Sequence, residues 1–504
     1  MVFSEAHRSS PPRALVLTPS DVSSFRTMTR WTLIFGCLAA CSDTSAPLAT
    51  KDTHPTTDLV TVRDSAERPD IELDTAEPAS PDTPTSTPDS TAPELPLPDT
   101  PDNPEPDSSA PPDTSAPPTP DTHEDETDPG PDLLGDESDL LDLIYGVDVP
   151  RTSSWWVDET TLHRGRDPVR LVGLNWFGLE TPDRALHGTW FGRSVESFLA
   201  ELASLGFNAL RIPVSPQSIH PGFPSAAWSH DAYTSGPATT GREHLERLLA
   251  AASEAGFAIL LDLHTCHPDQ LGQALPGSPD GCPGYTLDTW KADLAALATL
   301  ARPHPHVLGI DLFNEPHALT WAEWKTRVEA GAESVLTANP TLLIFVEGVA
   351  DRSPFGAHYP FWGGNLTEAG QNPPAIPRSR LVYSPHTYGP GVSAQSYFAA
   401  ADFPANMPGI WHGHFGHLAA THPVVVGEFG GFYDETHPGE ISWNEAFVAY
   451  LATLDRGRPA SFFYWALNPN SGDTGGLYED DWVTLVPRRL ALLAPLLAPD
   501  NQRP

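Results

Sequence analysis

The stretch VLGIDLFNEPH at residues 307–317 decides the fold. Its first half is a near-continuous apolar run, which is typical of a parallel strand buried on both faces of a sheet. The run ends in two polar side chains, Asn314 and Glu315, followed by a proline. Seven further runs of the same kind flank it, at residues 169–176, 208–214, 257–264, 341–348, 380–386, 424–429 and 461–467.

Amphipathic segments separate several of these runs. The spacing of apolar residues predicts helices over 194–206, 243–256 and 288–301. The first two segments end at Gly206 and Gly256, as helices that lead into a strand often do. Eight strands alternating with helices over about 350 residues predict one (β/α)8 TIM barrel. A doubly wound open sheet is the alternative, but no glycine-rich phosphate loop follows the first strand.

Polar side chains stand repeatedly at the C-terminal ends of the predicted strands, where a barrel places its catalytic residues. A barrel that served only as a scaffold needs few of them. A ring of carboxylates, imidazoles, an arginine and an indole instead indicates a carbohydrate-processing cleft. The ring comprises Asn175, Arg211, His264, Asn314, Glu315, Glu347, His386, Tyr388, Glu428 and Trp465.

Two glutamates of this ring match a requirement of glycoside cleavage, which needs one carboxylic acid and a second carboxylate across the sugar. Glu315 ends the fourth predicted strand and Glu428, in VVGEFGG, ends the seventh. This NEP and GEFG pairing resembles glycoside hydrolase family 5. The resemblance runs from roughly Ser154 to Pro495 and is densest to the bacterial endo-β-1,4-glucanases (cellulases) of that family. The blocks that carry it are GLNWFGLET, LRIPVS, GIDLFNEPH, LLIFVEGV, FWGGNL, SRLVYSPH, FPANMPGIW, VVGEFG, LNPNSGDTGG and DDW.

The resemblance implies Glu315 as general acid/base and Glu428 as nucleophile of a retaining enzyme. Their carboxyl groups should then lie about 5 to 5.5 Å apart. The pKa of Glu315 should be raised by its surroundings and by the nearby carboxylate. Arg211 and Tyr388 are expected to donate to Glu428 and keep it ionised. Neither a metal nor an organic cofactor is expected.

The remaining ring members are expected to bind substrate. Asn314 is placed to bond the sugar 2-hydroxyl, and His264 and His386 to position the sugar and Tyr388. Trp465 offers a flat apolar face for the sugar ring at the cleavage point. For each histidine the alternative is a satisfied core residue.

Tryptophans of the family blocks are further candidates for stacking on glucose rings, and Trp176 is the one assigned to substrate binding. For any of them, packing in the core is the alternative. Glu347, in FVEG, is interpreted as a structural hydrogen-bond partner. The other candidates are Trp190, Trp362 and Trp482.

Two cysteines, Cys266 and Cys282, lie in the predicted barrel region. A disulfide between them is the simplest interpretation of this pair in an exported protein. The cluster HTCHPD at residues 264–269 raises a metal site as the alternative, but its spacing fits no standard zinc pattern.

Residues 42–142 hold most of the charge. Of the net −38 of the whole chain, this stretch carries 27 acidic and 3 basic residues, together with 20 prolines and no Phe, Trp or Tyr. Such a segment buries too little apolar area to offset its ordering entropy, so we predict a disordered linker. The acidic excess also argues against a nucleic-acid partner.

Residues 1–41 resemble a bacterial export leader. Arg30 precedes the short apolar run WTLIFGCLAA, which ends at Cys41 and is too short to span a bilayer. The segment at 38–41, LAAC, resembles a lipobox, which predicts lipidation of Cys41 and an outer-membrane or cell-surface lipoprotein. An ordinary cleaved signal is the alternative. Met28 is a candidate start, because the stretch before it looks like neither a signal nor a domain.

These patterns together predict a secreted, lipid-tethered endo-β-1,4-glucanase whose catalytic barrel occupies residues 143–504. It would act on cellulose or a related β-glucan as a monomer, with the lipid as its only membrane contact. A β-mannanase or xyloglucanase on the same scaffold is one alternative. A non-catalytic glycan-binding surface protein is another, and the presence of both glutamates argues against it.

Overall fold

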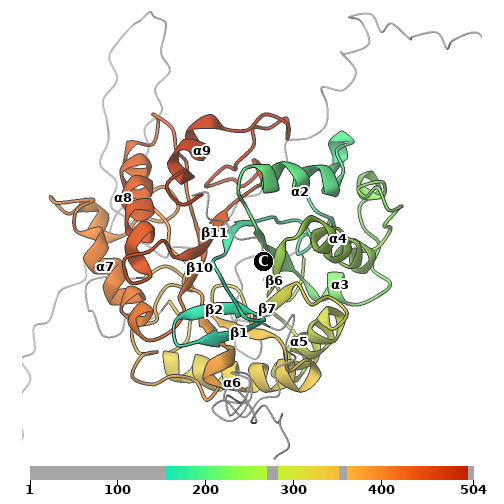
Figure 1. The fold of residues 1–504 in the computed structure, drawn as a ribbon, viewed down its shortest axis with the longest axis horizontal. Helices are drawn as coiled ribbons and strands as arrows, with labels where there is room; N and C mark the ends of the chain where they lie inside the picture. Colours follow the sequence, from blue (N-terminus) through green and yellow to red (C-terminus); the bar gives the residue numbers. More distant parts are fainter. Residues whose placement is uncertain (1–154, 269–281, 351–359, 498–504) are drawn as a thin grey trace, which may run out of the picture. The chain divides into compact units, whose positions relative to one another are not determined.

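Eight parallel strands form the central sheet of the computed structural model, which describes residues 155–268, 282–350 and 360–497 (Figure 1). The predicted leader, lipid-bearing Cys41 and linker lie outside these residues. All eight predicted strands are present. They are β4 (Val172–Asn175), β5 (Ala209–Val214), β6 (Ala258–Leu263), β7 (Val307–Asp311), β8 (Leu343–Val346), β9 (Leu381–Tyr383), β10 (Val425–Gly430) and β11 (Ser461–Trp465).

The strands pair in the order β10-β11-β4-β5-β6-β7-β8-β9, each parallel to its neighbour. Isolated parallel bridges, Tyr383 to Val424 and His386 to Glu428, join the two outermost strands, β9 and β10. The sheet therefore closes on itself, which confirms the TIM barrel and excludes the open doubly wound sheet.

Helices surround the strands on the outside of the barrel (Figure 1). The three predicted helices are present, and Gly206 and Gly256 adopt the left-handed φ values of +95° and +75° that end a helix. Side-chain caps, such as Thr240 accepting from the backbone N–H of Glu243, start several of them. The α-helices are α2 (Val195–Ser204), α3 (Pro216–Ile219), α4 (Gly241–Ala255), α5 (Leu287–Ala301), α6 (Trp321–Ala338), α7 (Met407–His414), α8 (Pro438–Leu454) and α9 (Pro487–Leu493). The 3-10 helices are η2 (Thr189–Phe191), η3 (Ala227–Ser229), η4 (Arg378–Arg380), η5 (Ser396–Ala399) and η6 (Gly416–Ala420).

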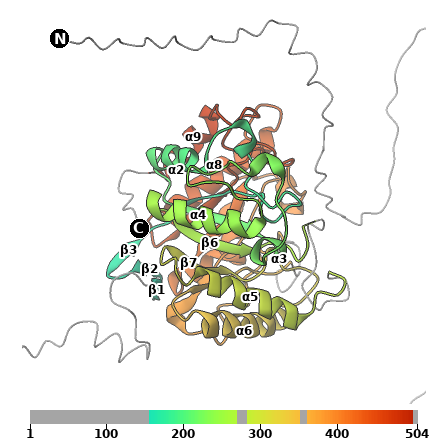
Figure 2. The same ribbon diagram turned by 90° about the vertical axis from the view of Figure 1, so that its right-hand side faces the viewer.

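A small antiparallel sheet covers one end of the barrel and was not predicted. It consists of β1 (Trp155–Asp158), β2 (Thr161–Arg164) and β3 (Asp167–Val169). Trp155 packs in one buried cluster with side chains of the barrel strands such as Phe463. Figure 2 shows this sheet on one side of the barrel and α3, which follows the C-terminal end of β5, on the opposite side. The small sheet therefore covers the end of the barrel opposite the C-terminal ends of the strands, where the sequence predicts the substrate site.

Among the described residues, no helix combines the length and the apolar character that a bilayer crossing requires.

Candidate active site

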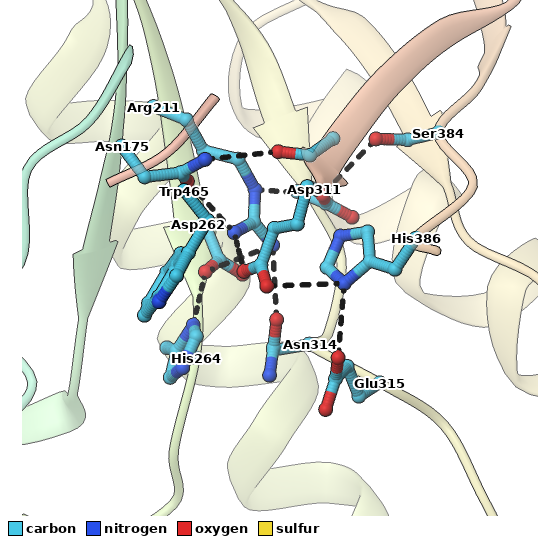
Figure 3. A network of polar contacts seen from close by, with 12 residues as sticks. Asn175, Arg211, Asp262, His264, Asp311, Asn314, Glu315, Ser384, His386 and Trp465 are labelled. Carbon is cyan, nitrogen blue, oxygen red and sulfur yellow. Dashed lines mark hydrogen bonds and ion pairs between the residues drawn. The ribbon is translucent and has the colours of Figure 1, made fainter. Parts of the chain in front are cut away.

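Arg211 lies at the centre of a polar network on the C-terminal ends of the strands (Figure 3). Its side chain is fully buried, and Nη1 donates to Asn175 Oδ1 at 3.1 Å while Nη2 donates to Asn314 Oδ1 at 3.1 Å. One guanidinium therefore orients two amides and also faces several acids. The carboxylates within ion-pair distance of it are Asp262 (3.0 Å), Asp311 (3.2 Å), Glu347 (3.1 Å) and Glu428 (2.5 Å).

Glu428 is held from two sides. Its Oε1 accepts from Arg211 Nη1 at 2.5 Å, and its Oε2 accepts the hydroxyl of Tyr388 at 2.5 Å. Both donors favour the ionised carboxylate, as the sequence predicts for a nucleophile. Glu428 belongs to β10 and Tyr388 to the loop after β9. The bridge between His386 and Glu428 brings these two segments together.

Glu315 faces the same space from beyond β7, and its side chain is 23% exposed. His386 Nδ1 lies 3.2 Å from Glu315 Oε1 and 3.5 Å from Glu428 Oε2. One carboxylate oxygen of Glu315 and one of Glu428 lie within 4.8 Å of each other. The two glutamates, far apart in the sequence, thus form one pair at the open side of the network.

Burial raises the pKa of Glu315 well above its ordinary value, and the adjacent Glu428 carboxylate raises it further. Burial also raises the pKa of Glu428, but Arg211, the nearby His264 and the Tyr388 hydroxyl all act to lower it. The donors that favour the charged form thus surround Glu428. The pKa is therefore raised more strongly at Glu315 than at Glu428.

His264 and Trp465 pack against each other beside the network. His264 Nδ1 lies 2.6 Å from Asp262 Oδ2, and its ring stacks on the Trp465 indole with centroids 5.8 Å apart. Phe177 stacks on Trp465 at 5.5 Å, and the indole N–H donates to Ser471 Oγ at 3.0 Å. The indole is 5% exposed and its orientation is determined by these contacts.

Comparison with known proteins decides the family. Residues 164–471 match the family described as Cellulase (glycosyl hydrolase family 5). The major extracellular endoglucanase of Xanthomonas campestris pv. campestris is 39% identical over 65% of this chain and 68% of its own length. The chain belongs to glycosyl hydrolase family 5. It is a glycoside hydrolase of the cellulase family.

Other relatives agree with this assignment. An endoglucanase of Paenibacillus polymyxa is 38% identical over 62% of the family 5 chain and 79% of the relative. An endocellulase of Pyrococcus horikoshii, solved as a variant in complex with cellotetraose, superposes with a TM-score of 0.64. It is 32% identical, over 70% of this chain and all of that one.

Glu347 of the family 5 enzyme occupies the structural position that the sequence suggested for it. It is fully buried, and its Oε2 accepts the backbone N–H of Glu315 at 2.8 Å. Its Oε1 lies 3.2 Å from His386 Nε2 as well as accepting from Arg211. The backbone of Glu315 has a φ of +52°, which is uncommon for a residue with a side chain, and this hydrogen bond helps to hold it there.

One predicted substrate contact is wrong. Trp176 is fully buried: its N–H donates to the carbonyl of His187 at 2.9 Å and its ring packs on Phe198 of α2. The indole therefore faces the helix layer, whereas its neighbour Phe177 packs against Trp465. Trp482 is likewise 98% buried.

The other two tryptophan candidates are half-buried. Trp362 stacks on His317, two residues after Glu315, with ring centroids 3.9 Å apart. Trp190 packs edge-on against Trp228, which is 36% exposed. Both indoles keep part of their surface open, so they remain candidates for stacking on sugar.

Two acids of the network were not predicted as site residues. Asp262 and Asp311 stand inside the predicted apolar runs of β6 and β7 and are fully buried. The signal was present, because a carboxylate inside an otherwise apolar strand needs a buried cationic partner. Burial raises the pKa of Asp311 to about 7 despite Arg211.

The structure joins Cys266 and Cys282 in a disulfide, with Cα atoms 6.3 Å apart. In the HTCHPD cluster, Cys266 is therefore not available as a thiolate ligand, and His264 Nδ1 is engaged by Asp262. Asp269, the last member of that cluster, lies outside the described residues.

Proposed function

We propose that this chain is a retaining endo-β-1,4-glucanase that hydrolyses internal bonds of cellulose or a related β-glucan. The observation that carries the proposal is the Glu315 and Glu428 pair at the strand ends of a family 5 barrel. The relatives named above are endoglucanases or an endocellulase, which favours a glucan over a mannan backbone.

In the first step, Glu315 protonates the leaving oxygen while Glu428 attacks the anomeric carbon. Retention is supported by the spacing, since inverting pairs stand about 6.5 to 9.5 Å apart to admit a water, and oxygens of this pair come within 4.8 Å. The donors on Glu428 keep it charged until it attacks.

In the second step, Glu315 acts as a base on the water that releases the sugar. Forming the glycosyl ester removes the charge of Glu428, which is one of the causes that raise the pKa of Glu315. The pKa of Glu315 therefore falls when the role of the residue changes from acid to base.

Neighbouring groups position the sugar. Asn314 Oδ1 accepts from Arg211, so its amide N–H groups are the ones that can donate to the 2-hydroxyl. Trp465, held by Phe177 and His264, supplies an apolar face at the cleavage point.

Glu428→Gln tests the proposal directly. Removing the nucleophile while keeping the side-chain shape should lower reducing-end release from carboxymethylcellulose by about 10³-fold or more. Glu445→Gln, an exposed position on α8, is the matched control and should keep wild-type turnover. Turnover retained by Glu428→Gln would exclude this mechanism.

Two further measurements refine the assignment. Side-by-side rates on cellulose, mannan and xyloglucan distinguish the glucanase from other backbone specificities. Proton NMR of the first product should show the β-anomer; the α-anomer would rule out double displacement.

We further propose that the enzyme is secreted as a monomer, anchored by lipid at Cys41 and extended from the membrane by residues 42–142. The leader and linker patterns of the sequence support this, as does the extracellular endoglucanase relative. Incorporation of labelled fatty acid into the wild type but not into Cys41→Ala is the expected result. Equal labelling of both would exclude this anchor.

A further inference from the structure

Glu440 is a buried carboxyl group that the reaction above does not use. It lies in the first turn of α8 and is 2% exposed. Its Oε1 accepts the backbone N–H of Gly391, and Nδ2 of Asn444 lies 3.5 Å from its Oε2. A buried acid with a specific backbone partner calls for an explanation, because burial of a carboxyl group is costly.

Three glycines enclose this carboxyl group. A Cβ added to Gly389 would lie 2.4 Å from Glu440 Oε1, and one added to Gly431 would lie 2.0 Å from Oε2. One added to Gly391 would lie 3.0 Å from Cγ. Two separate loops therefore reach the same side chain only because they carry glycine at the points of contact.

The two segments also carry the partners of the hydrogen bond from the Tyr388 hydroxyl to Glu428, the proposed nucleophile. Gly389 directly follows Tyr388, and Gly431 comes three residues after Glu428. Among the described residues, only isolated bridges join strands β9 and β10 at this point. The carboxyl group of Glu440 thus connects the two segments just beyond the place where they leave the barrel.

Charged groups approach Glu440 from each neighbouring element. His437 precedes it at the start of α8, Asp473 comes from the loop after β11, and Arg489 of α9 donates to the carbonyl of Gly431 at 3.0 Å. Burial raises the pKa of Glu440 to about 7, although the N–H of Gly391 and the nearby His437 act to lower it. The side chain can therefore act as a hydrogen-bond acceptor in either protonation state.

We propose that Glu440 is a positioning residue that clamps the loop of residues 389–391 to Gly431 and so holds Tyr388 at hydrogen-bonding distance from Glu428. The inference rests on the proposed function, because Glu428 is the nucleophile in that function. The side-chain hydrogen bonds described for Glu440 go to Gly391 and Asn444, which are not members of the glutamate pair.

The test is a double-mutant cycle on carboxymethylcellulose. Glu440→Ala should lower kcat about tenfold with KM within about twofold of wild type, because the reacting groups lose alignment. In a Tyr388→Phe background the same change should cost less than about twofold, since the bond it supports is already absent. An equal loss in both backgrounds would overturn the clamp.

Two variants separate the clamp from a general role in folding. Glu440→Gln keeps the acceptor and should retain kcat within about twofold. Glu445→Ala, on the exposed face of the same helix, should match wild type. If Glu440→Ala fails to fold, Gly389→Ala displaces the carboxyl group while keeping it, and should give the same dependence on Tyr388.

A readout independent of turnover distinguishes failure of the clamp from failure of the proposed function. The carboxyl resonance of Glu428 in glutamate-labelled protein should titrate at higher pH in Glu440→Ala, because the Tyr388 bond lowers the pKa of Glu428. An unchanged titration would reject the clamp even if the enzyme proved inactive on every glucan.

Discussion

At the residue scale, the polar network at the strand ends is held together by one cation among several acids. Arg211 is the shared partner of Asp262, Asp311, Glu347 and Glu428. One positive charge does not compensate four carboxylates in a buried site, and burial raises the pKa values of Asp311 and Glu347. Glu428 remains the acid best supplied with donors, which is what its role requires.

Tyr388→Phe should shift the acidic side of the pH–rate profile. The hydroxyl lowers the pKa of Glu428, so removing it raises that pKa, and the nucleophile becomes protonated at higher pH. The acidic limb of kcat/KM is expected to move to higher pH, with a loss of kcat. Rates measured from pH 4 to 8 would check this; an acidic limb in the same place would show that the hydroxyl does not support the charge.

At the scale of strands and helices, close packing around the backbone determines whether a glycine can be replaced by a residue with a side chain. Gly173 of β4 faces the ring of Phe463 on β11, and an added Cβ would lie 2.2 Å from its Cδ1. Gly409, in the first turn of α7, has open space around it. The same substitution by alanine can therefore be compared at a crowded glycine and at an open one.

Gly173→Ala should lower the free energy of unfolding by about 1 to 3 kcal/mol, because the barrel wall must move to admit the methyl group. Gly409→Ala should leave it unchanged or raise it by up to about 1 kcal/mol, since alanine is the better helix former. Urea unfolding of both variants measures the difference. Similar effects at the two sites would show that strand packing does not limit position 173.

The strands could be predicted from the sequence because a strand buried on both faces is apolar along its length. The meeting of Glu315 and Glu428 could be predicted because both follow the ends of such strands, and the family resemblance singles them out among the polar residues there. The sheet β1–β3 could not, since its short strands are partly exposed and only their contact with the barrel end makes them ordered. The error at Trp176 arose because adjacent residues at a strand end face opposite layers. The role proposed for Glu440 could not be predicted from the sequence around it, because the residues that it contacts lie in segments distant in the sequence.

At the scale of the whole molecule, charge and chemistry occupy different segments. Most of the acidic excess lies in residues 42–142, whereas the contacts of the catalytic network run from Asn175 to Ser471. The described contacts of the network are thus all made by residues that follow the acidic stretch in the sequence.

A chain shortened to residues 143–504 should keep kcat/KM on soluble carboxymethylcellulose within about twofold of the full chain, because mutations and deletions remote from a site are usually independent of it. Initial rates of the two proteins, purified in parallel, provide the measurement. A large loss in the shortened chain would mean that the preceding segment takes part in catalysis.

The closure of the barrel has a consequence for its motions. Seven of the eight neighbouring strand pairs share ladders, two of which contain a register shift, whereas β9 and β10 meet through isolated bridges, one of them at His386 and Glu428. Local opening begins where backbone pairing is sparsest. In the proposed function, Glu428 and Tyr388 stand on either side of this same line, so backbone pairing is sparsest where we propose that the chemistry takes place. In the proposed mechanism, a sugar is esterified to Glu428 of β10 and contacts residues that follow β9, such as His386 and Tyr388. The glycosyl intermediate would therefore connect the two strands and should stabilise the barrel against opening between them.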